Sequence, residues 1–385
     1  MHVHTSVNKL CFVINTFSFF KSHRLDLITT LAKRFGYEIT VITSCAGIDK
    51  NDLAEIKDLG IELIHTPQRT ELSNIFQYQF RLFRILRERQ FDSIIFVTLE
   101  LSFLGSSLSF LLPRTNQVFM ISGLGHHYFR KNIKTYIISA LRDFTFNLAS
   151  WKNIKNCFIF QNSNDLEEFS KKKFLKNHKK YIIHGNGINL EKFSYQIREF
   201  KKISFCFSGR CAKTKGIDLI LDSFLKLSEL NKNIEIDLKL FLLNEDGEDS
   251  FSIPKEFLQN KKISFFFNLT EQELISAYEN CDIFLLASER EGISRAAQEA
   301  AASGMPIIAA NNPGTNEVVL DNKNGFLFDL GIKDDLFYKM QKIIDEKSNL
   351  KKFSLNSRKL VEENYSLNEV SLQFDRLLKR LKDER

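Results

Sequence analysis

The sequence holds no pattern of cysteine or histidine that is typical of a metal site. Its six cysteines are scattered along 385 residues, and no two of them form a Cys-x-x-Cys pair. The eight histidines include no cluster at zinc-ligand spacing. This usage argues against a disulfide framework, and we expect reduced thiols in the core of a cytosolic protein.

No run of apolar residues is long enough to predict a transmembrane helix. The longest uncharged apolar stretch, Leu101–Pro113, is shorter than the about 20 residues that a spanning helix needs. The apolar segment Leu10–Phe20 lacks the basic start and the cleavage site of a signal peptide, so we expect a first buried strand there. With 43% apolar and 26% charged residues, the chain is typical of a soluble globular protein of about two domains.

Common nucleotide-binding signatures are also missing. The first strand leads into Asn15–Phe20 without a Gly-x-Gly-x-x-Gly fingerprint, which argues against a nicotinamide enzyme. The loop Phe207–Gly216 lacks the Walker pattern. The acidic segment Asp246–Asp249 is interpreted as a surface turn, so no convincing metal-binding Asp-x-Asp is present.

Positive charge is concentrated in the first half of the chain. Residues 1–195 carry 26 Lys and Arg against 16 Asp and Glu, whereas the rest carries 28 against 31. Within the first half, Tyr128–Lys155 interleaves cations with aromatic and aliphatic residues and has one acidic residue, Asp143. Such a helix can lie on an anionic membrane surface, and the alternative is an ordinary amphipathic helix with a solvated basic face. Without a recognition motif, and with an acidic second half, no nucleic-acid partner is expected.

Strand and helix patterns alternate along the first half, which is typical of a doubly wound parallel sheet. Short β-branched and aromatic runs predict strands at Leu10–Ile14, Glu38–Thr43, Glu62–His65, Ser93–Val97, Val118–Ile121, Cys157–Gln161 and Tyr181–His184. Helical spacing predicts helices at Ser22–Phe35, with Ser22 as its cap, Asn51–Leu59 and Ile75–Arg89.

The same alternation restarts after a polar linker. It predicts strands at Ile203–Phe207, Ile236–Leu243, Ile263–Phe267, Ile283–Leu286, Ile307–Ala310 and Gly325–Phe328, and helices at Gly216–Leu230, Thr270–Glu279, Arg295–Ser303 and Leu355–Leu381. We therefore expect an α/β protein with two Rossmann-like doubly wound domains, residues 1–196 and 197–365, that face a cleft. A C-terminal helix, residues 366–385, could pack back on the first domain.

The strongest functional signal is the segment Glu291–Glu299, which follows a predicted buried strand. Gly292 permits an unusual backbone conformation, and Ser294 can cap the next helix. Free amides at a helix N-terminus favour negative charge, so the segment predicts a diphosphate site. Glu291 lies before the helix and Glu299 just over one turn into it, so we expect them to bind different ligand hydroxyls. The alternative is two exposed glutamates that stabilise a helix start.

A second loop adds positive charge to this predicted site. After the strand that begins at Ile203, Gly209 lets the backbone approach a ligand. Arg210 can hold a phosphate through two hydrogen bonds, while Lys215 acts as a point charge. Taken alone, the loop could equally be a flexible basic surface turn.

These motifs resemble those of the retaining glycosyltransferases of family 4. Glu291-x7-Glu299 resembles the paired-glutamate motif, and Ser208–Arg210 with Lys215-Gly216 resembles the phosphate-binding turn. Other similar elements are the inter-domain junction Asn186–Phe193 and the late segments Asn312–Glu317 and Asn324–Phe328. Ser22–Arg24 and Ser122–Gly125 resemble a subgroup that builds bacterial surface polysaccharides. The resemblance covers almost the whole chain and is more specific in the second domain.

The resemblance implies the glycosyltransferase-B fold and a reaction without a metal or other cofactor. In the donor site, Glu299 would hold the ribose hydroxyls of a nucleotide, and Glu291 would face the donor sugar. Backbone amides that would bind sugar and diphosphate belong to Gly292, Ile293 and Ser294. Arg210 and Lys215 would neutralise the diphosphate as it leaves.

The first domain departs from the family at one position. Many relatives carry a histidine after the strand that matches Val118–Ile121, where this chain has Ser122-Gly123. The nearest histidines are His126 and His127, and His126 is the candidate catalytic residue on this side. His23 is a further candidate.

The sequence therefore predicts a retaining glycosyltransferase. It would move a sugar from a nucleotide-sugar donor, a UDP-sugar by resemblance, to a growing O-antigen or capsule-type glycan. The basic, aromatic first domain favours an acceptor on a polyprenyl diphosphate and a peripheral enzyme at the cytoplasmic face of the membrane. The alternative is an isomerase of the same architecture, such as a nucleotide-sugar 2-epimerase, which would need no acceptor site.

Overall fold

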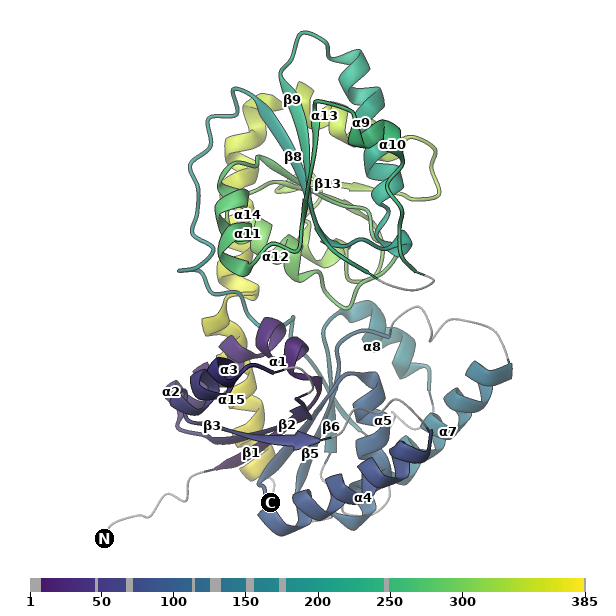
Figure 1. Cartoon of the computed structure of the whole chain (residues 1–385), viewed down its shortest axis with the longest axis vertical. Coiled ribbons are helices and arrows are strands. Elements are labelled where there is room, and N and C mark those ends of the chain that lie inside the picture. Colours follow the sequence, from purple (N-terminus) through teal and green to yellow (C-terminus); the bar gives the residue numbers. More distant parts are fainter. Residues whose placement is uncertain are drawn as a thin grey trace. The chain divides into compact units, whose positions relative to one another are not determined.

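The structure is a computed structural model that describes residues 8–45, 48–66, 72–112, 115–124, 133–149, 156–172, 178–245 and 249–383 (Figure 1). It divides into two compact α/β units. The first comprises Met1–Gly187 together with Leu367–Arg385, and the second comprises Ile188–Ser366. The division thus falls before Ile188, whereas the sequence placed it after residue 196.

A seven-stranded parallel sheet forms the centre of the first unit, in the order β3-β2-β1-β4-β5-β6-β7. Its strands are β1 (Lys9–Thr16), β2 (Glu38–Ser44), β3 (Ile61–Thr66), β4 (Ser93–Val97), β5 (Asn116–Ile121), β6 (Asn156–Phe160) and β7 (Lys179–Ile182). Strands β4, β5 and β6 are buried along their length and β1 is buried in its middle, because helices cover both faces of the sheet.

Two apolar cores fill the space between this sheet and its helices. One core includes side chains of α1 (Phe17–His23), α2 (Leu25–Phe35), α3 (Lys50–Asp58) and α15 (Leu367–Asp383). The other includes side chains of α4 (Leu72–Arg89), α5 (Leu99–Leu108), α7 (Ile133–Ala149) and α8 (Ser163–Ser170). Helix α15 packs on α2, and the Tyr37 hydroxyl donates to Asp375 at 2.9 Å. The last helix of the chain is therefore part of the first unit.

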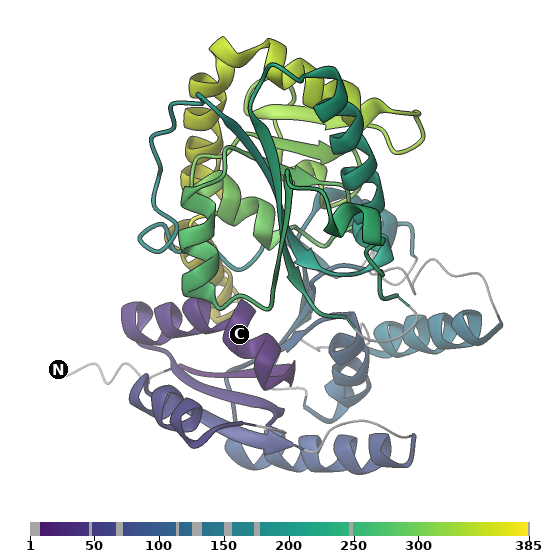
Figure 2. The ribbon, with the colours of Figure 1, turned by 45° about the horizontal axis from the view of Figure 1, so that its top comes forward.

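The second unit contains a six-stranded parallel sheet in the order β10-β9-β8-β11-β12-β13. Its strands are β8 (Ile203–Arg210), β9 (Ile236–Leu243), β10 (Ile263–Phe267), β11 (Ile283–Leu286), β12 (Ile307–Ala310) and β13 (Gly325–Phe328). Helices α9 (Ile217–Leu230), α10 (Lys255–Leu258) and α13 (Asp335–Asp345) lie on one side, and α11 (Glu271–Glu279), α12 (Arg295–Ala302) and α14 (Leu350–Asn364) on the other (Figures 1 and 2). This is the doubly wound arrangement that the alternating pattern predicts.

Two predicted helices are wrong in their extent. Ser22 does not begin a helix, because α1 starts at Phe17 and Thr16 caps it through Phe19 N. The predicted single helix Leu355–Leu381 is two helices that break at Tyr365–Ser366. All six cysteines lie in described ranges as free thiols, and five of them are buried. None of the helices in the described ranges combines the length and the hydropathy that crossing a bilayer requires.

Candidate active site

Two loops of the second unit meet where its strand order reverses. Strands β8 and β11 are adjacent at the centre of the sheet, and the chain proceeds outward from them in opposite directions. Ligands of doubly wound sheets bind at such a switch point, beyond the carboxyl ends of the strands. Here the loop after β11 contacts the loop after β8 through a hydrogen bond from Glu289 N to Thr214 O, 3.1 Å long.

The turn after β8 approaches β11 closely because residue 216 is glycine. Gly209 and Arg210 end the strand, and the short 3-10 turn η3 (Lys213–Lys215) leads to Gly216, whose φ is 65°. A Cβ atom at this position would lie 2.5 Å from the carbonyl oxygen of Ala287. Glycine therefore supplies both the left-handed conformation and the space that the turn needs.

A third loop fixes the backbone of Glu291. Glu291 N donates to Pro313 O at 3.0 Å, in the loop that follows β12. The next residue, Gly314, has a φ of 76°, and a Cβ atom there would lie 2.1 Å from the carbonyl oxygen of Glu291. The position of Glu291 thus depends on backbone contacts with a neighbouring loop as well as on its own sequence.

Helix α12 directs its N-terminus toward this loop. Ser294 caps the helix by accepting a hydrogen bond from Ala297 N at 3.3 Å. The six residues Ala297–Ala302 are all buried, because their mostly small side chains let the helix lie close to the sheet. Gly292 and Ile293 immediately precede the cap. The first-turn amides therefore form the kind of site that binds a phosphate or another anion.

Lys215 and Glu291 form an ion pair at this edge of the sheet. The Lys215 Nζ lies 2.5 Å from Glu291 Oε1, and the two side chains are 14% and 17% exposed. The sequence predicted that both belong to the donor site, but it did not predict that they would contact each other. Their partial burial strengthens the interaction relative to a fully exposed pair.

Glu299 lies on the buried side of α12 and is 7% exposed. Its Oε1 accepts a hydrogen bond from Nε of Arg295, one turn earlier, at 2.7 Å. Sequence reasoning did not single out Arg295, although its spacing of four residues from Glu299 is a recognisable signal for a helical ion pair. Burial and the Glu299 carboxylate both raise the pKa of the nearby Tyr278 phenol, which therefore stays neutral.

Arg210 is the most accessible charge of the candidate site. Its side chain is 53% exposed, and Nη1 lies 2.9 Å from Oε1 of Glu245. Glu245 was missed from the sequence, since it is 35 residues away. The signal that could have found it is strand pairing, because Arg210 aligns with Leu243 at the end of β9.

The histidine candidates belong to the first unit and are not among the residues of the site in the second unit. His126 and His127 lie outside the described residues. His23 stacks on the ring of Phe19, with centroids 4.7 Å apart, and its Nδ1 lies 2.6 Å from the Ser22 hydroxyl. Next to it, the buried Arg24 donates from Nη2 to the Ser122 hydroxyl at 2.9 Å and from Nη1 to the Asn186 side chain.

The second unit therefore combines a helix N-terminus, two cations and two carboxylates around one edge of its sheet. The helix N-terminus and cations suit an anion, and the carboxylates suit hydroxyl groups. Within the described residues, no three His, Cys, Asp or Glu side chains are grouped so that they could hold a metal ion.

These features define an α/β protein with a candidate site for an anion at the switch point of its second sheet. Solved structures show that its fold is that of the GT-B glycosyltransferases. A glycosyltransferase from Rickettsia africae ESF-5 superposes with a TM-score of 0.74 at 16% identity, covering 99% of this chain and 100% of that chain. Anabaena Alr3699/HepE in complex with UDP-glucose gives a TM-score of 0.72 at 15% identity, covering 97% of this chain and 99% of that chain.

The second unit of the chain matches a known protein family. Residues 187–360, which make up almost all of the second unit, match the family of glycosyl transferases group 1. The second unit is therefore similar to the group 1 glycosyltransferases.

Two curated relatives match different lengths of this chain. The capsular polysaccharide biosynthesis glycosyltransferase CapM of Staphylococcus aureus is 26% identical over 47% of this chain and 50% of its own length. N,N'-diacetylbacillosaminyl-diphospho-undecaprenol alpha-1,3-N-acetylgalactosaminyltransferase of Campylobacter jejuni is 23% identical over 84% of this chain and 88% of its own length. The first match thus spans about half of each protein.

Proposed function

We propose that the chain is a glycosyltransferase that moves a sugar, with retention of the anomeric configuration, from a UDP-sugar to a lipid-linked glycan of a surface polysaccharide. The Lys215–Glu291 pair beside the N-terminus of α12 is the observation that carries the proposal. The HepE complex with UDP-glucose supports the choice of donor, because that protein shares the fold. The name of the capsular relative supports the choice of product.

The donor would lie along α12. Its ribose hydroxyls bind Glu299, whose orientation Arg295 fixes. Its diphosphate binds the first-turn amides of the helix, and its sugar faces Glu291. Arg210 exchanges the Glu245 carboxylate for a phosphate oxygen, which its exposed position permits.

Breaking the bond between sugar and phosphate leaves negative charge on the departing diphosphate. Lys215 is held by Glu291 before the donor arrives, so its ammonium group needs little reorganisation to stabilise that charge. The Glu291 carboxylate, on the sugar side, suits the positive charge that develops at the anomeric carbon. The pair thus stabilises both ends of the bond that breaks.

Transfer by variants tests this assignment. Glu299→Ala and Arg210→Ala should strongly reduce transfer at a subsaturating concentration of a UDP-sugar, because they remove a ribose contact and a phosphate contact. Lys201→Ala is the matched control, since that side chain is 85% exposed and pairs with Glu199. NMR of the product gives the anomeric configuration. Undiminished transfer by either site variant, or an inverted product, would contradict the proposal.

An exposed apolar surface on the first unit supports a membrane-bound acceptor. We define the α4–α7 surface as the exposed large apolar residues of α4, of η1 (Ser109–Leu111) and of α7, which are Phe76, Phe80, Phe110, Leu111, Tyr136, Ile137, Ile138, Leu141 and Phe144. Phe76 is 81% exposed and Tyr136 is 77% exposed. Exposed aromatic residues in such number mark an interaction surface.

The helices of the α4–α7 surface are joined to one another. Gln79 of α4 donates to Leu104 O of α5 at 3.1 Å, and Ser106 of α5 donates to Thr145 of α7 at 2.9 Å. Both views show α4 and α7 extending on the same side of the first unit (Figures 1 and 2). Helix α4 also carries four arginines and one glutamate, a charge that matches an anionic bilayer.

We therefore propose that the α4–α7 surface rests on the cytoplasmic face of the membrane, where a polyprenyl diphosphate would present its glycan. The name of the Campylobacter relative gives a diphospho-undecaprenol acceptor, which supports this choice. The basic segment Tyr128–Lys155 contains α7 but not α4. That Phe76 and Phe80 of α4 belong to the same surface follows only from the structure, in which α4 is hydrogen-bonded to α5.

Vesicle flotation tests the membrane proposal. The chain should float with vesicles of anionic phospholipid at low salt, and the double variant Phe76→Ser/Phe80→Ser should float at least about threefold less. The matched control is Leu230→Ser/Leu258→Ser, which removes two residues of the second unit that are 63% and 54% exposed. Equal flotation of both double variants, or no flotation of the parent chain, would contradict it.

A nucleotide-sugar 2-epimerase is the alternative that the fold alone would permit. The relatives reported above are glycosyltransferases by name, and they give it no support. Incubation with a UDP-sugar in the absence of any acceptor distinguishes the two functions. A transferase leaves the configuration at C2 of the sugar unchanged, whereas an epimerase inverts it, and NMR separates the products.

A further inference from the structure

The C-terminal end of α12 is held by two arginine side chains. Arg198 donates from Nη1 to the carbonyl oxygen of Ser303 at 2.5 Å. Arg358 donates from Nη1 to the carbonyl oxygen of Ala302 at 2.9 Å. These carbonyls belong to the last turn of the helix, where no amide further along the helix can satisfy them.

The two arginines come from outside the strand–helix–strand unit that contains α12. Arg198 belongs to the linker before β8 and is 6% exposed. It also donates to two carbonyls at the end of α11, of Cys281 at 2.6 Å and of Tyr278 at 3.2 Å. The guanidinium is thus surrounded by carbonyl oxygens, which satisfy it without a direct carboxylate contact.

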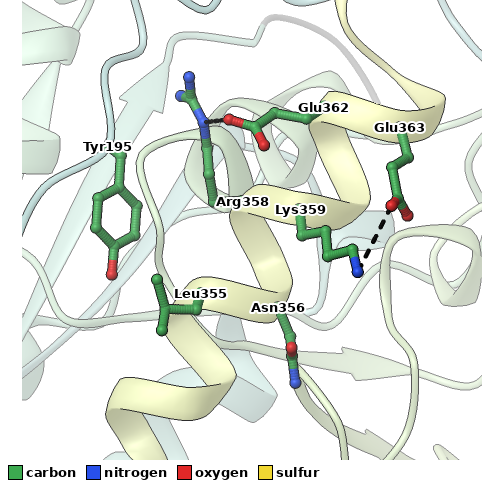
Figure 3. Close-up of a pocket in the computed structure, with 7 residues that line it drawn as sticks. All are labelled: Tyr195, Leu355, Asn356, Arg358, Lys359, Glu362 and Glu363. Carbon is green, nitrogen blue, oxygen red and sulfur yellow. Dashed lines mark hydrogen bonds and ion pairs between the residues drawn. The ribbon is translucent and has the colours of Figure 1, made fainter.

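Arg358 belongs to α14 and connects the same helix end to the linker. Its Nη1 also donates to Phe193 O at 2.9 Å, and its Nε lies 2.7 Å from Oε1 of Glu362. Figure 3 shows Arg358, Glu362 and Tyr195 beside a surface pocket of about 560 Å³ along α14. Arg358 is therefore oriented by its own helix before it reaches α12.

The linker itself is fastened to this end of α12. Gln196 N donates to Ser303 O at 3.2 Å, and the Tyr195 hydroxyl lies 3.2 Å from the Ser354 hydroxyl of α14. A Cβ atom at Gly304, whose φ is 82°, would lie 2.6 Å from the Tyr195 ring. The end of α12 thus contacts the linker and α14 together, which fixes it from two sides.

Charge at one end of a short helix affects binding at the other. The eight residues of α12 span about 12 Å, and its C-terminal carbonyls carry the negative end of the helix dipole. Two guanidinium groups at that end neutralise it, so the positive potential at the N-terminus is less opposed. They also fix the axial position of the helix, and with it the position of Glu299 and the first-turn amides.

We infer that Arg198 and Arg358 are positioning residues for the donor diphosphate, acting from the far end of α12. This inference rests on the proposed function, because it assumes that the diphosphate binds the N-terminus of that helix. Neither arginine contacts the donor. Each affects the binding of the donor by fixing the position of α12 and by neutralising the negative end of its dipole.

Titration with UDP tests the inference. Arg358→Met retains most of the aliphatic stem and removes the charge, Arg358→Lys retains the charge, and Arg198→Met repeats the change at the other site. The matched control is Lys359→Met, at the adjacent position of α14, where the side chain is 69% exposed. The Kd for UDP should rise about fivefold to tenfold in both Met variants and less in Arg358→Lys, but stay unchanged in Lys359→Met.

A purely structural role would give a different result. It would lower the unfolding temperature of the Met variants but leave the Kd for UDP of the folded protein within twofold of the parent value, which would overturn the inference. If Arg198→Met does not fold, the Arg358 series decides alone. Failure of the parent chain to bind UDP would instead contradict the proposed function.

Discussion

Lys215 Nζ lies 2.5 Å from Oε1 of Glu291, so the cation from the loop after β8 is positioned by a carboxylate from the loop after β11. This contact joins the two loops at the switch point of the second sheet. It also gives each residue a role that depends on the other, because removal of either partner leaves a partly buried charge without its counter-charge.

Replacement of Lys215 should reduce the rate of transfer more than the affinity for the donor. In Lys215→Met we expect kcat to fall about 100-fold, since the cation stabilises charge that develops as the diphosphate leaves. Initial rates over a range of UDP-sugar concentrations measure both constants. A rise in KM without a fall in kcat would mean that Lys215 acts only in binding.

Gly314→Ala should impair donor use through the backbone of Glu291. The added Cβ would lie 2.1 Å from the carbonyl oxygen of Glu291, so the loop must move. Gly36→Ala is the matched control, because Gly36 has a similar φ of 72° and its Cβ would meet nothing within 4 Å. The left-handed conformation should cost both variants about 1 kcal/mol, whereas the close contact with Glu291 should cost Gly314→Ala further stability and its activity. Equal activities would contradict the proposed role of the loop.

Removal of the Glu245 carboxylate should strengthen donor binding. Glu245 holds Arg210 at 2.9 Å and, on the proposed function, competes with phosphate for the same guanidinium. We expect Glu245→Gln to lower the Kd for UDP about twofold to threefold, which matches the strength of an exposed ion pair. Glu256→Gln, a change of the same charge at an exposed position on α10, controls for net charge. An unchanged Kd in Glu245→Gln would show that Arg210 does not exchange partners.

The first unit should lose stability in mildly acidic solution because of His178. Burial, with a smaller contribution from the charge of Lys180, lowers the pKa of His178 to about 4. The unfolded chain therefore binds a proton near pH 6.5 that the folded chain does not bind until about pH 4. The stability contributed by the neutral ring is present above pH 6.5 and is lost as the pH falls through this window.

Urea unfolding at pH 7 and pH 5 measures this effect. The parent chain should lose about 1–2 kcal/mol more than His178→Gln between these two values. The ring is buried beside Asn156, with Nδ1 2.5 Å from Oδ1, and beside Phe158, at a centroid distance of 5.1 Å, and this burial is the main cause of the low pKa. Equal losses in the two proteins would mean that His178 is protonated in the folded state.

Much of the second unit could be predicted from the sequence because its signals are local. The strand Ile236–Leu243 alternates apolar and charged residues before four consecutive apolar residues, and its observed bounds are those predicted. The helix break at Tyr365–Ser366 could not be predicted, because no glycine or proline marks it. It depends on distant partners, since Tyr365 O accepts from Ile188 N and the Tyr365 hydroxyl donates to Glu317 O.

The candidate site also combines local features that the sequence predicts with distant contacts that it does not predict. The Gly-rich turn, the Ser294 cap and the two glutamates could be recognised from spacing alone. The contacts that fix them could not, because Glu245, Gly314 and Arg358 come from other strands and helices. Sequence patterns thus locate the groups that bind a ligand, whereas their orientation depends on packing between distant segments.

Isothermal titration of UDP into the parent chain and into Glu299→Ala tests the central claim most directly. The account predicts binding of one UDP per chain in the parent. Glu299→Ala should weaken that binding by about 2 kcal/mol, roughly 30-fold, because a charged hydrogen-bond acceptor for the ribose is lost. Lys359→Met should bind as the parent does. Equal affinities in the parent and Glu299→Ala, or no binding of UDP by the parent, would contradict the placement of the donor on α12.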